Sequence, residues 1–223
     1  MEEHVVKILR AEHVTHNVKQ FKIEKPEGYK FIPGQATEIS VNTPAWKDER
    51  RPFTFTSLNE WDHLEFTIKI YADRKGVTDQ LGKLKVGDEI VLHEVFGAIH
   101  YYGEGTFIAG GAGVTPFIAI LRQLQKENHL GKNQLIFSNN TAKDIILKDE
   151  FTKMLGNRFI NTLTAEKSNQ YDNRMIDEKY LAEKTETFDQ YFYLCGPDPM
   201  VEAIQRALIN LGTDKARVIV EQF

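Results

Sequence analysis

TFIAGGAGVTPFIAILRQLQKEN, residues 106–128, joins an apolar run to a glycine-rich turn and then to a helical pattern. The run TFIAGG has the length and composition of a buried strand. Thr115 is placed to cap the following helix, and Pro116 suits its first turn. The apolar side of that helix is formed by Phe117, Ile120, Leu121 and Leu124. A buried strand, a glycine turn and a capped helix in this order are typical of a parallel α/β sheet.

The rest of the second half repeats this alternation. Further strands are predicted at 134–139, 158–164, 190–196 and 216–223, and further helices at 146–155, 176–184 and 198–212. Asp198 and Pro199 are placed to cap and begin the last helix, and Gly212 to end it. We therefore predict a five-stranded parallel α/β domain over residues 102–223.

The first half alternates apolar and polar residues with a period of two. Strands are predicted at 4–9, 18–23, 36–42, 52–57, 64–71 and 88–93, separated by turn sequences such as KPEG and VGDE. In LEFTIKIY, residues 64–71, the alternation predicts a half-buried strand with Glu65, Thr67 and Lys69 on its polar face. Six such strands predict a closed antiparallel barrel over residues 1–101.

Composition narrows the classes of function. The 223 residues carry a formal charge of -4, which gives no basic footprint for nucleic acid. No apolar run reaches the ~18 residues of a membrane span, and the N-terminus lacks a secretion signal, so we expect a cytoplasmic protein. The one cysteine, Cys195, excludes an intrachain disulfide and a cysteine-rich metal site, and the pair His13 and His16 has no further ligand nearby in sequence. Redox chemistry would therefore need an organic cofactor, and we predict no metal site.

Three motifs have the chemistry of phosphate binding. GGAGVTP, residues 110–116, has glycines at a helix N-terminus, although Pro116 stands where the usual dinucleotide fingerprint has its third glycine. RPFTFTS places Arg51 on a strand, and KGVT places Gly76–Thr78 before a short helical segment. Taken singly, each has a plain structural alternative: a connecting turn, a surface arginine, or core residues at Phe53 and Phe55.

Together and in order, five motifs resemble the ferredoxin–NADP reductase superfamily across almost the whole chain. They are FIPGQ (31–35), RPFT (51–54), KGVT (75–78), GGAGVTP (110–116) and CGPDPM (195–200). The resemblance implies a flavin-binding barrel followed by a nicotinamide-binding α/β domain. We expect the bare two-domain form, without an attached iron–sulfur or haem module.

The resemblance assigns flavin-binding roles in the first half. It places Arg51 and Pro52 at the flavin pyrophosphate, Phe53 where the family has a stacking tyrosine, and Thr54 where it has a serine near flavin N5. The remainder of the flavin nucleotide would be held by Lys69, Ile70, Tyr71, Gly76, Val77 and Thr78.

The resemblance assigns the second half to the nicotinamide nucleotide. The phosphate loop would consist of Gly111, Ala112, Gly113, Val114, Thr115 and Pro116, and the nicotinamide would lie against Cys195, Gly196, Pro197 and Met200. Cys195 is expected to position the ring rather than act as a nucleophile, because no adjacent residue supplies a cation. VEQF would supply Glu221 as an acidic residue and Phe223 as an aromatic cover of the flavin, although Phe223 could also simply end a strand. The expected catalytic residues are Thr54, Cys195, Glu221 and Phe223.

These assignments predict a flavin-dependent NAD(P)H oxidoreductase that passes electrons to a separate acceptor: a ferredoxin, a flavodoxin or an oxygenase component. FAD is favoured over FMN as the commoner family choice. NADH is favoured over NADPH because Glu166 stands in LTAE, residues 163–166, where NADPH-specific relatives have a Ser-Arg pair; Lys143, Lys167 and Arg174 could compensate. The basic cluster Arg74, Lys75, Lys83 and Lys85 is either a solvated face or a dock for an acidic carrier. A flavin reductase using free flavin and a non-catalytic flavin-binding subunit remain the alternatives, and the oligomeric state stays open.

Overall fold

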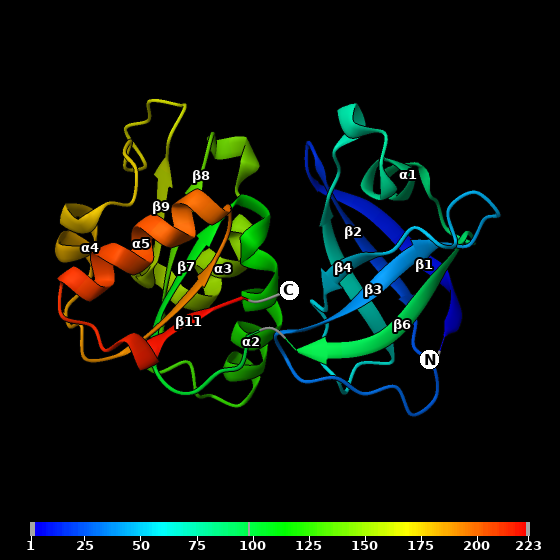
Figure 1. Ribbon diagram of the computed structural model, residues 1–223, viewed down its shortest axis with the longest axis horizontal. Coiled ribbons are helices and arrows are strands. Elements are labelled where there is room, and N and C mark those ends of the chain that lie inside the picture. Colours follow the sequence, from blue (N-terminus) through cyan, green and yellow to red (C-terminus); the bar gives the residue numbers. More distant parts are fainter. Residues whose placement is uncertain (1–2, 98, 222–223) are drawn as a thin grey trace. The chain divides into compact units, whose positions relative to one another are not determined.

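The computed structural model describes residues 3–97 and 99–221 (Figure 1). The chain forms two compact units. Of the described residues, the first comprises 3–97, Ile99, His100 and Thr115–Gln123, and the second comprises Tyr101–Val114 and 124–221. No helix among the described residues is both long enough and apolar enough to cross a membrane.

The first unit is built on a six-stranded antiparallel sheet. Its strands are β1 (His4–Thr15), β2 (Val18–Glu24), β3 (Gln35–Val41), β4 (Arg51–Thr54), β5 (His63–Lys69) and β6 (Glu89–Gly97), in the order β4-β3-β6-β1-β2-β5. All six predicted strands are present. A short helix, α1 (Val77–Lys83), follows β5 (Figure 1).

The sheet is barrel-like but not closed, so the prediction of a closed barrel was wrong in this respect. In the described residues, the outer strands β4 and β5 meet at an isolated antiparallel bridge between Phe55 and Phe66 and at a hydrogen bond from the Thr56 amide to the Glu65 carbonyl. β4 has only four residues, and Pro52 within it has no N–H to donate to a ladder. The two edges therefore touch at one point rather than along a seam.

The polar face of β5 is buried, against the prediction of a half-buried strand. Glu65 is 3% exposed and Thr67 is 5% exposed. Arg122, which belongs to helix α2 (Thr115–Lys126), covers this face and binds Glu65. Period-two alternation correctly separates the two faces of the strand, but it does not reveal that a helix distant in sequence covers the polar one.

The second unit contains a five-stranded parallel sheet, as predicted. Its strands are β7 (Gly105–Gly110), β8 (Gln134–Asn139), β9 (Phe159–Leu163), β10 (Tyr191–Cys195) and β11 (Val218–Val220), in the order β11-β10-β7-β8-β9. Helices α4 (Glu178–Lys184) and α5 (Asp198–Asn210) pack on one face, and α5 crosses in front of the sheet in Figure 1. Helix α3 (Lys148–Leu155) packs through Phe151 on Phe159 of the sheet.

The two predicted helix caps are wrong by one position. Helix α2 begins at Thr115 itself, because the glycine loop Gly111–Val114 is already wound as a 3-10 turn that leads into it. Helix α5 begins at Asp198, with Pro197 as its N-cap. At the other end, Leu211 is the C-cap and Gly212 follows it with a φ of 92°, a conformation that glycine adopts without strain.

Candidate functional site

Arg51 lies at the surface of β4 in the first unit. Its side chain is 56% exposed, and its guanidinium contacts only neighbouring residues: Nη1 donates to the Arg50 carbonyl, and Nη2 lies 3.8 Å from Glu49 Oε2. Pro52 beside it is also exposed. An exposed guanidinium held by weak local contacts is able to bind an anionic group such as a pyrophosphate.

Phe53 and Thr54 complete the strand and turn inward. Phe53 is half-buried and packs against the core of the sheet, whereas Thr54 is buried. The next aromatic residue, Phe55, is fully buried and stacks on Phe31 at 4.2 Å between ring centroids. Phe55 is therefore a core residue, while Phe53 keeps part of its ring accessible.

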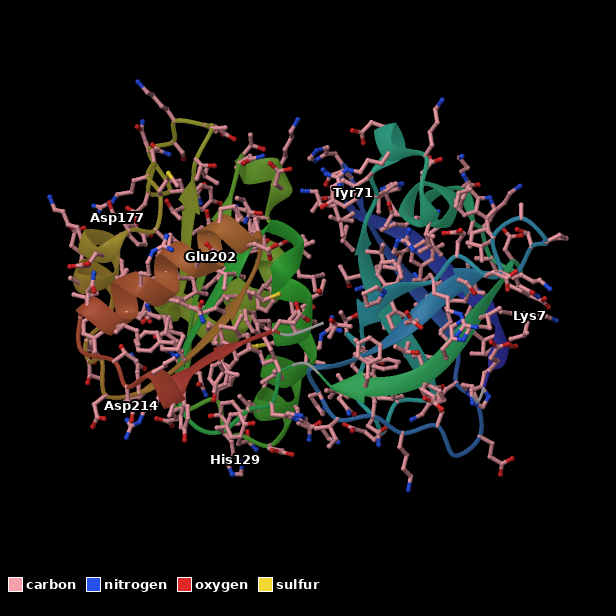
Figure 2. All side chains as sticks on the ribbon, viewed as in Figure 1. Lys7, Tyr71, His129, Asp177, Glu202 and Asp214 are labelled. Atoms are coloured by element: carbon pink, nitrogen blue, oxygen red, sulfur yellow. The ribbon has the colours of Figure 1, made fainter. Side chains whose placement is uncertain are left out.

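A second corner of the first unit lies where β5 ends. Tyr71, labelled in Figure 2, has Lys69 Nζ 5.7 Å and the Arg74 guanidinium 4.5 Å from its ring centroid. Gly76 precedes α1, and a Cβ added there would meet nothing within 4 Å. Val77 is buried at the start of α1, and Thr78, like Ile70, is half-buried. The corner thus combines an aromatic ring, two cations and open space beside a backbone turn, which suits an anionic nucleotide.

In the second unit the glycine loop packs directly against the CGPDPM segment. A Cβ at Gly113 would lie 2.3 Å from the Cys195 carbonyl oxygen, and one at Gly110 would lie 2.6 Å from Met200 Sδ and 2.9 Å from Pro197 Cδ. A Cβ at Gly196 would lie 3.1 Å from the Gly110 backbone. These glycines are therefore required by contact between the two motifs, which the sequence placed in the same site but did not show to touch.

The exposed part of this site is small. Val114 and Pro116 are buried, whereas Gly111, Ala112, Gly113 and Thr115 are partly exposed. Pro197 is exposed at the start of α5. Backbone groups of a glycine-rich turn therefore face solvent next to a helix start, which is the arrangement expected of a phosphate-binding loop.

Cys195 and Glu221 form a hydrogen-bonded pair at the ends of β10 and β11. Cys195 Sγ donates to Glu221 Oε2 at 2.7 Å, and among the described residues the other carboxyl oxygen, Oε1, has no partner. Burial raises the pKa of Glu221 to about 7, an effect that the hydrogen bond from Cys195 partly offsets. Burial, and next the charge of Glu221, raise the pKa of the Cys195 thiol well above its usual range. The thiol therefore stays protonated, which supports a positioning role over a nucleophilic one.

The loop after β9 carries Glu166. Its Oε2 accepts a hydrogen bond from the Ala142 amide at 2.8 Å, so the carboxylate is fixed at the first residue of the short turn after β8. Arg174, one of the cations that could compensate, donates to Glu183 at 2.8 Å and lies 3.5 Å from Asp177, which is labelled in Figure 2. Two carboxylates thus already engage the guanidinium nearest to this loop in sequence.

Other predicted features fall outside these clusters. Phe223 lies outside the described residues. Among the described residues, no group of three His, Cys, Asp or Glu side chains is arranged to hold a metal. In the basic cluster, Lys83 pairs with the buried Asp79 at 2.8 Å and Arg74 stacks on Tyr71, so two of its four cations have local partners.

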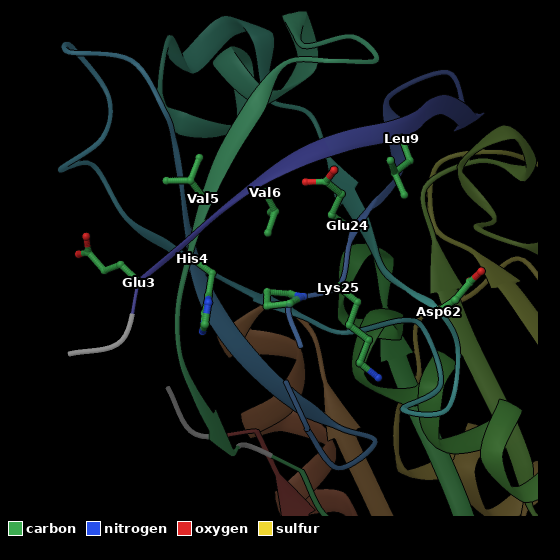
Figure 3. A pocket seen from close by; sticks show the side chains of 9 residues that line it. Glu3, His4, Val5, Val6, Leu9, Glu24, Lys25 and Asp62 are labelled. Atoms are coloured by element: carbon green, nitrogen blue, oxygen red, sulfur yellow. The ribbon is translucent and has the colours of Figure 1, made fainter. Parts of the chain in front are cut away.

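Figure 3 shows a pocket beside β1, lined in part by His4, Lys25 and Asp62. None of the predicted site residues lines it.

Sequence reasoning missed one cluster, the buried pair Glu65 and Arg122. Both residues lie in the first unit, 57 positions apart along the chain. The polar alternation of β5 marked Glu65 as exposed, and the helical pattern of α2 gave Arg122 no role. A charged residue beside the apolar stripe of a buried helix is the only signal that the sequence offers.

Comparison with known proteins identifies both halves of the chain. A family model for the oxidoreductase FAD-binding domain matches residues 5–101, and one for the oxidoreductase NAD-binding domain matches residues 107–206. The reductase component of propane 2-monooxygenase from Rhodococcus jostii is 26% identical, over 97% of this chain and 62% of its own length. NADH-cytochrome b5 reductase 1 from Eremothecium gossypii is 29% identical, over 92% of this chain and 78% of its own. The chain thus spans less than two thirds of the Rhodococcus protein.

Solved structures share the fold. The flavohem-like FAD/NAD binding domain of nitric oxide dioxygenase from Vibrio cholerae superposes with a TM-score of 0.88 at 23% identity, covering 98% of both chains. A ferredoxin NADP+ reductase from Neisseria gonorrhoeae, solved with bound FAD and NADP, superposes with a TM-score of 0.82 at 22% identity, covering 95% of this chain and 92% of its own.

Proposed function

The chain belongs to the ferredoxin–NADP reductase superfamily, and from this we propose that it oxidises NADH with bound FAD and delivers the electrons to a separate acceptor. The observation that carries the proposal is the packing of the glycine loop on Cys195–Met200, with the Cys195–Glu221 pair beside it. This packing brings a phosphate-binding turn and a buried proton-holding pair together in a domain of the NAD-binding family.

The residues of the first unit fit FAD. Arg51 offers an exposed guanidinium to the pyrophosphate, and Tyr71 offers a ring flanked by Lys69 and Arg74 to the nucleotide end. Phe53 and Thr54 would face the isoalloxazine ring from β4. When bound, FAD accepts a hydride from the nicotinamide and releases the electrons to an acceptor.

Residues in the second half of the chain would orient the nicotinamide nucleotide. The Gly111–Pro116 turn would bind its pyrophosphate through backbone amides. Cys195, Gly196 and Pro197 would form a floor for the nicotinamide ring. Glu221, with a pKa of about 7, can hold or release a proton near neutral pH beside that floor. Phe223, which lies outside the described residues, is proposed as a cover for the flavin on the resemblance alone.

NADH is the proposed electron donor. By the resemblance, Glu166 stands in the segment that would meet a 2′-phosphate, and the Ala142 amide fixes its carboxylate. Arg174 is engaged by two carboxylates and is poorly placed to neutralise that phosphate. The negative charges of Glu166 and of a 2′-phosphate repel each other, so a nucleotide without the 2′-phosphate is favoured.

The acceptor is proposed by class. The similar proteins include a reductase component of a monooxygenase and a cytochrome b5 reductase, so a ferredoxin, a flavodoxin, an oxygenase component or a small cytochrome are the candidates. We also propose 101/102 as the domain boundary, between the two family-model matches. The cytoplasmic location stays a prediction.

Purified protein tests this function against its alternatives. A yellow protein whose extracted flavin is FAD, and whose colour bleaches with NADH, supports the proposal. A colourless protein that oxidises NADH only when free flavin is added would instead be a flavin reductase. A yellow protein that neither NADH nor NADPH bleaches would be a flavin-binding subunit without this activity.

A further inference from the structure

The buried ion pair of the first unit joins three segments. Arg122 Nη1 donates to Glu65 Oε1 at 2.6 Å and to the Thr56 carbonyl at 2.6 Å. Thr56 Oγ1 donates to the same Glu65 oxygen at 2.8 Å. Glu65 is 3% exposed and Arg122 is 9% exposed, so both charges are out of water. Helix α2, strand β5 and the segment after β4 therefore meet at one carboxylate oxygen.

Additional contacts fix the geometry of this cluster. The Glu65 amide donates to Ser57 Oγ at 3.1 Å, and the Thr56 amide donates to the Glu65 carbonyl at 2.8 Å. The Arg122 guanidinium lies 5.4 Å from the centroid of the Trp61 ring. Both the backbone and the side chain of Glu65 are thus tied to the segment 56–57, and the guanidinium is held between a carboxylate and an aromatic face.

Stability alone does not explain such a pair. Removing two charges from water costs several kcal/mol for each ion, and apolar side chains of similar volume often stabilise a fold equally well or better. In some proteins a buried, hydrogen-bonded pair instead fixes a single relative placement of the elements that it joins.

The elements that it joins carry proposed site residues. Thr56 is two residues beyond Thr54, which is the last residue of β4. Arg122 is seven residues beyond Thr115, about two turns and 10 Å along α2. The part of α2 from Thr115 to Gln123 belongs to the same unit as β4.

We propose that Glu65 and Arg122 form a positioning pair for hydride transfer, holding the start of α2, with Thr115 and Pro116 of the nucleotide loop, in a fixed place relative to Phe53 and Thr54. This inference rests on the proposed function. Hydride transfer depends steeply on the placement of the reacting atoms, and a misplacement of about 1 Å can reduce the rate by about a hundredfold. The pair therefore acts on the rate through geometry and does not itself touch the reactants.

The test uses two variants of the FAD-loaded protein. Removing one charge alone would leave a net charge buried in the cluster. The variants are therefore Glu65→Leu/Arg122→Met, which removes both charges, and Arg122→Lys, which keeps the pair. Stopped-flow measurements give the limiting rate of flavin reduction by NADH and the dissociation constant of NADH. Melting temperature, the dissociation constant of FAD, and amide hydrogen exchange of the apo-proteins are measured in parallel.

We expect the double variant to fold and to bind FAD and NADH within several-fold of the unaltered protein, but to reduce its flavin about ten- to a hundredfold more slowly. Its amides in 54–57 and 115–122 should exchange faster, with the rest of the sheet unchanged. Arg122→Lys should retain most of the rate of flavin reduction of the unaltered protein. The matched control is Glu12→Gln, which breaks the exposed Arg10–Glu12 pair at 2.6 Å in the same sheet and should change none of these quantities.

Three results would overturn the positioning role. One is a double variant with the rate and exchange of the unaltered protein. The second is a loss of rate that is accompanied by losses of FAD affinity and of melting temperature. The third is failure of both variants to fold. Either of these last two results would make the pair a stabilising element. If the unaltered protein is not reduced by NADH or NADPH, the proposed function has failed, whereas unchanged exchange in the double variant counts against the pair itself.

Discussion

At the scale of single residues, two carboxylates are buried against partners that their neighbours in the sequence do not indicate. Glu221 follows the last strand and is buried against a thiol, while Glu65 lies in a regularly alternating strand and is buried against a guanidinium. Neither partner is near in sequence. Local patterns identified the strands correctly, but the chemistry of these two residues comes from long-range contacts.

Glu221 should make folding stability depend on pH. Its pKa in the folded protein is about 7, above the ordinary glutamate value of 4.5, so the folded state binds the proton more tightly between these two values. Stability from this group is therefore fully present below about pH 4.5 and is lost as the pH rises through about 7, by up to about 3 kcal/mol. Denaturant unfolding at pH 5 and pH 8 should show a larger loss for the unaltered protein than for Glu221→Gln. Equal losses would contradict the buried placement of this carboxyl group.

Arg51→Ala should weaken FAD binding without unfolding the sheet, because the side chain is exposed and makes only local contacts. A hydrogen bond to a charged group contributes about 1.5 to 3 kcal/mol, which corresponds to roughly ten- to a hundredfold in the dissociation constant. Flavin fluorescence on dilution gives that constant. Arg10→Ala, also exposed on the sheet, is the control. An unchanged constant for Arg51→Ala would mean that this arginine does not contact the flavin.

At the scale of elements, the sequence predicted the eleven strands found among the described residues and helices α2 to α5, since their periodicities are strong. It failed at the helix starts and at the closure of the barrel. The cap at Thr115 was misplaced because a 3-10 turn precedes the helix, and winding of a glycine loop leaves no compositional mark. The prediction of a closed barrel failed because β4 has only four residues and contains a proline, which limits its pairing with β5. The alternating patterns of the six strands do not reveal this limit.

The contact between the glycine loop and the CGPDPM segment gives a prediction for Gly113→Ala. The new Cβ would lie 2.3 Å from the Cys195 carbonyl, so the backbone of one motif must move. Such overpacking costs about 1 to 3 kcal/mol, and NADH binding should weaken together with it. Thermal unfolding of the apo-protein and NADH titration of the loaded protein measure both effects. Gly76→Ala, where a Cβ meets nothing, should leave the melting temperature of the apo-protein unchanged; a stable Gly113→Ala variant with normal NADH affinity would refute the contact.

At the scale of the whole molecule, the five motifs predicted both cofactor-binding domains, which the family models confirm. The motifs could not supply the nucleotide preference or the acceptor, because these depend on loops outside them. Glu166 is one such residue, and its fixed carboxylate is the observation behind the proposed preference for NADH.

The preference for NADH predicts how Glu166 variants behave. Glu166→Gln removes the charge but keeps a side-chain oxygen for the Ala142 amide, so discrimination against NADPH should fall several-fold, on the scale of about 1 kcal/mol for one partly exposed charge. Steady-state kcat/KM values for NADH and NADPH measure it, with Glu12→Gln, an exposed carboxylate of the first unit, as the control. A higher kcat/KM for NADPH than for NADH in the unaltered protein would contradict the preference.

The central claim is that nicotinamide and flavin react directly in this protein. Anaerobic stopped-flow mixing of the FAD-loaded protein with NADH, and with NADH carrying deuterium at either hydrogen of nicotinamide C4, tests it most directly. The account predicts that the flavin absorbance bleaches in a single turnover, that the rate saturates with NADH, and that deuterium at one of the two positions slows it. Flavin that stays oxidised at saturating NADH and NADPH, in protein that retains its FAD, would contradict the claim.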